Sequence, residues 1–166
     1  MALRGHVQTF GCQMHVHASD RMGGVFRAHG WQSVLTAEDA DLIVINTCSV
    51  REKAEQKLRS EVGKLAPLKL ARPDLPVVCM LGDGCFQMTC GEVAVAKRMG
   101  ITLPVVVLDD KWLALIKVKQ IRRQFPLYGT ELQTEDYTEP PQHYFGVPAV
   151  GVRNAAALEP AVAKAL

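Results

Sequence analysis

Three short, uninterrupted apolar runs constrain the fold of this chain more than any other feature. They are LIVIN at 42–46, PVVCML at 76–81 and PVVVL at 104–108, and a segment with helical spacing follows each of them. Continuous apolar runs of this length are typical of parallel strands that are covered by helices on both faces. The sequence therefore predicts an α/β fold with a mainly parallel sheet.

The other segments complete an alternation of strands and helices. In the last of the helices, Pro160 is expected in the first turn, where a missing N–H costs nothing. The further strands are predicted at 6–11, 32–35 and 147–152, and the helices at 19–30, 51–65, 89–100, 112–125 and 157–166. The segment 126–146 has little periodicity and is expected to be irregular.

Local signals set the helix ends. A hydroxyl followed three residues later by a carboxylate forms a capping box, and Ser49 with Glu52 and Thr89 with Glu92 have this spacing. Pro67 is expected to end the second helix, because proline has no N–H to donate within a helix.

These elements predict one domain over residues 1–166, a three-layer α/β/α sandwich with a doubly wound sheet of about six strands. The connection 36–41 is too short for a crossover helix, so the second strand is expected at an edge of the sheet. A flavodoxin-like order, 2-1-3-4-5 with a sixth strand appended, is the preferred Rossmann-like arrangement. The one compositional seam is the proline-rich LAPLKLARPDLP at 65–76.

Composition excludes several classes of protein. Hydrophobic residues make up 48% of the chain and charged residues 22%, and 19 basic and 17 acidic residues give a net charge of +2. This balance indicates no nucleic-acid partner. No apolar run approaches the roughly 20 residues that span a bilayer, and the beginning MALRGHVQTFG has no signal-peptide pattern. We therefore expect a cytoplasmic protein without a membrane partner, whose five cysteines are thiols, ligands or core residues.

The first part of the chain carries two specific motifs, TFGCQMHVHASDRMGG at 9–24 and ADLIVINTCSVREKAEQKLRSEVGKL at 40–65. With them, residues 1–68 resemble the N-terminal domain of the radical-SAM tRNA methylthiotransferases. That resemblance implies a four-iron cluster held by three cysteines at the ends of parallel strands.

Two positions of that cluster motif match, Cys12 and Cys48, whereas Asp83 stands at the position of the third cysteine. Cys85, two residues later, is the candidate for the third ligand. The alternative is that these cysteines hold no metal, because two ligands seldom retain a four-iron cluster.

The second part is marked by KLARPDLPVVCMLGDGCFQMTCGEVAVAKRMGITLPVVVLDDKWLALIKVKQ at 69–120 and YFGVPAVGVRNAAALEPAVAKAL at 144–166. Residues 69–166 resemble the diphosphate-binding domain of thiamine-diphosphate enzymes of the acetolactate synthase and decarboxylase group. The resemblance implies a Mg²⁺ ion that bridges the protein to the diphosphate of the cofactor.

The resemblance assigns the Mg²⁺ ligands to Asp83, to Asp110 in place of the family's Asn, and to the carbonyl of Trp112. Gly82 and Gly84 would let the backbone approach the phosphates closely. The alternative is a turn carboxylate that is solvated and binds nothing.

The two resemblances together predict a chimera, joined within 65–76 and made by engineering, since natural fusions are expected to join whole domains. The radical-SAM cysteine motif CxxxCxxC and the domain that activates thiamine diphosphate are both missing from this sequence. We therefore expect no native catalytic activity and no required cofactor or partner. The alternatives are an iron–sulfur-binding module and a residual binder of Mg²⁺ with a small diphosphate ligand.

Overall fold

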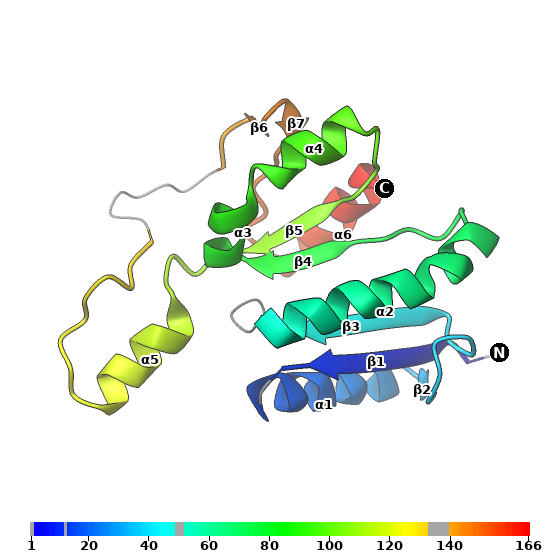
Figure 1. The fold of residues 1–166 in the computed structure, drawn as a ribbon, viewed down its shortest axis with the longest axis horizontal. Coiled ribbons are helices and arrows are strands. Elements are labelled where there is room, and N and C mark those ends of the chain that lie inside the picture. The colour runs from blue at the N-terminus through cyan, green and yellow to red at the C-terminus, as the bar shows by residue number, and fades with distance from the viewer. Residues whose placement is uncertain (1, 12, 49–51, 133–139) are drawn as a thin grey trace. The chain divides into compact units, whose positions relative to one another are not determined.

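The computed structural model describes residues 2–11, 13–48, 52–132 and 140–166. It divides into two compact units, Met1–Leu75 and Pro76–Leu166, each with its own parallel sheet (Figure 1). None of the described helices is long and apolar enough to cross a membrane.

The first unit is built on a three-stranded parallel sheet with the order β2-β1-β3. The central strand β1 pairs with β3 along most of its length, from Gly5 opposite Leu42 to Phe10 opposite Thr47. In chain order the elements are β1 (Arg4–Phe10), α1 (Gln13–Ala28), β2 (Gln32–Ser33), β3 (Leu42–Thr47) and α2 (Glu52–Ala71).

Helices α1 and α2 cover opposite faces of this sheet. Successive side chains of a strand point to opposite sides, so the adjacent residues Gln8 and Thr9 show which helix lies on which face. On one face the hydroxyl of Thr9 is hydrogen-bonded to that of Ser19 in α1, 2.7 Å away. On the other face the side chain of Gln8 is hydrogen-bonded to Glu61 of α2. The most buried apolar side chains of the unit, Cys48 and Ala54, are 9% and 5% exposed and lie at the end of β3 and the start of α2.

The second unit contains a parallel pair of strands, β4 (Cys79–Gly82) and β5 (Val105–Leu108), with Gly82 opposite Leu108. An antiparallel hairpin of β6 and β7 turns at Phe145 and Gly146, whose φ angles of 50° and 78° fit a type I′ turn. The other elements are α3 (Asp83–Thr89), α4 (Glu92–Arg98), α5 (Ala114–Arg122), β6 (His143–Tyr144), β7 (Val147–Pro148) and α6 (Ala155–Ala165).

The predicted α/β class with parallel strands is confirmed, but the continuous sheet of about six strands is not. The described residues form sheets of three, two and two strands. The last predicted strand is shortened to β7, and it pairs antiparallel with β6 inside the segment expected to be irregular. The single domain over 1–166, with halves at 1–68 and 69–166, stays a prediction.

Several of the predicted helix boundaries were wrong, and α1 begins at Gln13 and not at residue 19. Helix α2 continues through Pro67 to Ala71, since Pro67 is exposed and water can satisfy the carbonyl that loses its partner. Thr89 ends α3, its hydroxyl donates to the carbonyl of Cys85 at 2.9 Å, and α4 begins after Gly91 without a side-chain cap. The other predicted cap, Ser49, lies outside the described residues.

The last helix begins earlier than its sequence pattern indicates. The side chain of Asn154 accepts a hydrogen bond from the N–H of Ala157 at 2.9 Å and caps α6. Three alanines, the best helix formers, follow this cap and form the first turn. Pro160 therefore lies beyond the first turn, contrary to the prediction.

Candidate functional site

The carboxyl end of β4 holds the most constrained carboxylate of the second unit. Asp83 follows Gly82, the last residue of β4, and only 8% of its surface is exposed. One carboxylate oxygen, Oδ1, accepts a hydrogen bond from the N–H of Gly84 at 2.7 Å. The other, Oδ2, accepts from the N–H of Lys111 at 2.8 Å. The backbone at the start of α3 and in the segment after β5 therefore fixes this side chain.

Asp109 brings a second carboxyl group to the same place. It follows the last residue of the neighbouring strand β5, and its side chain is hydrogen-bonded to that of Asp83. The N–H of Lys111 also donates to Oδ1 of Asp109, at 3.0 Å. Lys111 has a φ of 64°, an uncommon angle for a residue with a side chain, and in this conformation its N–H serves both carboxyl groups.

Burial and then the neighbouring Asp109 raise the pKa of Asp83 above its ordinary value. The N–H groups of Gly84 and Lys111 oppose this shift by stabilising the charged carboxylate. Two negative charges at this position repel each other at neutral pH, so a proton or a cation between them is favourable. The chemical capacity of the site is therefore to hold positive charge between two oxygen donors.

We expect the Asp109→Asn variant to stabilise the second unit at pH 7 by on the order of 0.5–1 kcal/mol, a figure that allows for solvent screening of the exposed Asp109. Because the folded-state pKa of Asp83 is raised, the stability linked to its protonation is fully present below its ordinary pKa. That stability is lost as the pH rises through the raised pKa. The gain of the variant should thus be seen at pH 7 and disappear near pH 3, as measured by thermal unfolding.

Asp110→Asn is the matched control for this prediction. Oδ1 of Asp110 accepts the N–H of Trp112 at 2.9 Å, a bond that the amide oxygen of asparagine can also accept. The control should therefore unfold like the parent chain at both pH values. An equal gain from both variants would show that general charge reduction, and not the pairing with Asp83, controls stability here.

At the predicted Mg²⁺ site the structure brings a different aspartate to Asp83. Asp109, and not Asp110, is the residue whose side chain contacts Asp83. A Cβ at Gly82 would meet no atom within 4 Å, whereas a Cβ at Gly84 would lie 2.9 Å from Cδ2 of Leu113, which would have to shift. The ring of Trp112 is covered by the ammonium group of Lys117, 3.2 Å from its centroid. The Mg²⁺ role of these residues stays a prediction.

Two sequence families match this chain. The uncharacterized protein family UPF0004 matches residues 4–104. The C-terminal TPP binding domain of thiamine pyrophosphate enzymes matches residues 64–166. The chain belongs to both families. It is a chimera of the two, as the sequence motifs predicted.

Both families match residues 64–104, a range that contains β4, α3 and α4. The predicted junction at 68 and 69 lies inside this shared range. The strand β4 and the two helices after it therefore lie in a stretch of sequence that is matched by both families.

Curated relatives match the UPF0004 portion. The tRNA-2-methylthio-N(6)-dimethylallyladenosine synthase of Sorangium cellulosum is 48% identical over 102 residues, which are 61% of this chain and 20% of the relative. The enzyme of the same name from Cereibacter sphaeroides is 42% identical over 100 residues, 60% of this chain and 22% of the relative. That from Bacillus cytotoxicus is 47% identical over 83 residues, 49% of this chain and 16% of the relative. The chain spans about a fifth of the length of these relatives.

The candidate cluster cysteines of the UPF0004 portion are described only in part. Cys48 is buried directly after β3, and its N–H donates to the carbonyl of Phe10 at 3.0 Å. Cys12 lies outside the described residues, and Cys85 belongs to α3 of the second unit. Within the described ranges no three His, Cys, Asp or Glu side chains form a group that could hold a metal ion. The cluster ligands therefore stay a prediction.

Proposed function

We propose that this chain is a chimeric α/β protein whose second unit binds a divalent cation together with a diphosphate compound, without completing the reaction of either parent family. The observation that carries the proposal is the buried Asp83 carboxylate, held by two backbone N–H groups against Asp109. Mg²⁺ with thiamine diphosphate is the pair that the thiamine pyrophosphate family implies.

The donor set fits such a cation. Mg²⁺ prefers oxygen ligands and is commonly bound by one or two carboxylates together with phosphate oxygens and water. Asp83 and Asp109 would supply the two carboxylates. The cation would neutralise their repulsion and attract the diphosphate, and the open space around Gly82 leaves the approach unobstructed.

The absence of native activity is part of the proposal. Asp83 stands where the methylthiotransferase pattern has a cysteine. The aspartate that we assign to the diphosphate site therefore replaces a cysteine ligand of the iron–sulfur site. An engineered origin also belongs to it, because the two families meet inside a strand-and-helix repeat and not between whole domains. Turnover of either family's substrate by this chain alone would contradict this part.

An iron–sulfur-binding module is the second candidate. It is favoured by the end of β3, where Cys48 bonds to Phe10 at the end of β1, two residues before Cys12 in the sequence. Anaerobic reconstitution with iron and sulfide should then give broad visible absorbance that is lost in Cys48→Ala. A colourless product would rule the module out.

The experiment for the first candidate is a calorimetric titration of the full chain with thiamine diphosphate, with and without Mg²⁺. We expect binding only when Mg²⁺ is present. Inorganic pyrophosphate should also bind, whereas thiamine monophosphate should not, because the cation bridges to a diphosphate. No heat from any of these compounds in the presence of Mg²⁺ would overturn the proposal.

A further inference from the structure

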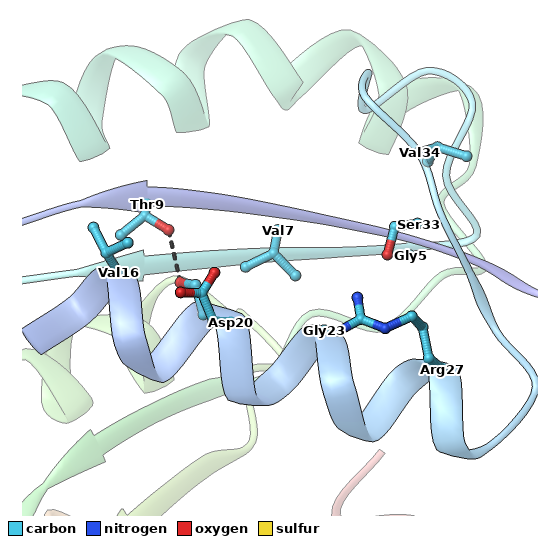
Figure 2. A pocket seen from close by; sticks show the side chains of 10 residues that line it. Gly5, Val7, Thr9, Val16, Asp20, Gly23, Arg27, Ser33 and Val34 are labelled. Atoms are coloured by element: carbon cyan, nitrogen blue, oxygen red, sulfur yellow. Dashed lines mark hydrogen bonds between the residues drawn. The ribbon is translucent and has the colours of Figure 1, made fainter.

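A hollow of about 460 Å³ lies in the first unit (Figure 2). It opens where β2 stops, so it combines an uncovered strand edge with the adjacent surface of a helix. Its walls come from β1, from α1 and from the end of β2, with Gly5, Val7, Thr9, Val16, Ser19, Asp20, Gly23, Arg27, Ser33 and Val34 as the lining residues.

The edge of β1 is paired with β2 only at its beginning. The N–H groups of Gln32 and Val34 donate to the carbonyls of Leu3 and Gly5, at 2.8 and 3.0 Å. Backbone groups alternate in direction along a strand, so the odd residues of β1 point to this edge. Consistent with this, the carbonyl of Phe10 points the opposite way and accepts from Cys48 beside β3.

Val7 and Thr9 are the next odd residues beyond Gly5, and their N–H and C=O groups have no backbone partner along this edge in the described part of the chain. Both residues line the hollow. An open strand edge of this kind is a template for pairing with another extended segment. Together the two residues offer two backbone N–H donors and two carbonyl acceptors that an additional strand could pair with.

The two charged residues that line the hollow make the charge along that edge asymmetric. Asp20 lies toward Thr9, whereas Arg27 lies toward Gly5 and Ser33 (Figure 2). Asp20 and Arg27 are seven residues apart on α1, about 10 Å along the helix axis. Neither side chain forms an ion pair with another described residue. A ligand on this edge would therefore meet negative charge at one end and positive charge at the other.

We propose that the open edge of β1 binds a short extended peptide as an added antiparallel strand, with a basic side chain toward Asp20 and an acidic one toward Arg27. In an antiparallel ladder the residues opposite Val7 and Thr9 exchange both hydrogen bonds with them, and their side chains point to the same face. That face is covered by α1, as the bond between Thr9 and Ser19 shows. The basic and acidic residues of the peptide are thus two positions apart, about 6.7 Å, and their long side chains span the remaining distance.

The test is an NMR titration of the full chain with two peptides of equal composition, acetyl-Thr-Lys-Val-Glu-Thr-amide and acetyl-Thr-Glu-Val-Lys-Thr-amide. We expect the first peptide to shift the amide signals of Val7 and Thr9. It should bind about tenfold more tightly than the second, because in the second peptide both ion pairs, with Asp20 and with Arg27, are replaced by contacts between like charges. The double variant Asp20→Lys with Arg27→Glu should reverse this preference. Both positions are exposed on α1, so the variant is expected to fold.

Backbone methylation of the first peptide separates strand pairing from simple charge attraction. A methyl group on the nitrogen of its Lys or Glu removes a donor that faces β1 and should abolish binding. Methylation of the central Val nitrogen, which faces outward, should leave binding within about threefold of the parent peptide. Equal binding of the two unmethylated peptides, or amide shifts that spare Val7 and Thr9, would overturn the proposal.

Discussion

Asp83→Ala is expected to abolish the Mg²⁺-dependent binding of thiamine diphosphate, with a loss of affinity of at least about 100-fold. Even outer-shell partners of a metal site commonly contribute 10–100-fold to affinity, and Asp83 is proposed as a direct ligand. Its carboxylate is buried and both of its oxygens accept backbone hydrogen bonds, so the carboxylate is held in place and the alanine variant loses it entirely. Calorimetry of the variant under the conditions used for the parent chain measures the effect.

Variants of the two following carboxylates identify the second ligand. Asp109→Ala should reduce the affinity strongly, whereas Asp110→Asn should change it by less than about threefold, because Asp109 and not Asp110 contacts Asp83. Circular dichroism and thermal unfolding would establish that each variant is folded. A larger effect at Asp110 than at Asp109 would contradict this assignment and favour the ligand set inferred from the family resemblance.

The apolar runs predicted β3, β4 and β5, because short runs rich in valine and isoleucine favour strands. LIVIN became most of β3, and PVVVL contains the whole of β5. The hairpin of β6 and β7 could not be predicted in this way, since each strand has only two residues. Its turn also depends on Phe145 adopting a positive φ, which no residue pattern indicates.

The candidate site was also predicted only in part, because some of its features depend on local sequence and others on the backbone of a distant segment. A carboxylate at the GDG turn could be placed at a strand end from the sequence alone, and Asp83 lies directly after β4. The sequence could not predict which of the two adjacent aspartates faces Asp83, because that depends on the backbone conformation after β5. There Lys111 adopts a φ of 64° and bonds to Asp83 and to Asp109. The pair DD in LDDKW was the only available signal, and it is ambiguous by itself.

Gly5→Val is expected to destabilise the first unit by about 2–3 kcal/mol, the cost of overpacking a closely packed position. A Cβ at Gly5 would lie 2.9 Å from Cδ2 and 3.1 Å from Cε2 of Phe26. The ring of Phe26 cannot move freely, because it is stacked on that of Trp31 with centroids 5.7 Å apart. Urea unfolding followed by the fluorescence of Trp31, in a Trp112→Phe background that removes the second tryptophan, would report this unit separately.

Gly63→Ala is the matched control, since a Cβ there meets no atom within 4 Å and the position is inside α2. Replacing an unobstructed helical glycine with alanine should stabilise the unit by up to about 1 kcal/mol. The two glycine substitutions thus have opposite expected signs, although each adds a side chain to the same unit. If Gly5→Val left the urea midpoint unchanged, α1 could not be packed on β1 through Phe26, and the floor of the peptide-binding edge would have to be assigned differently.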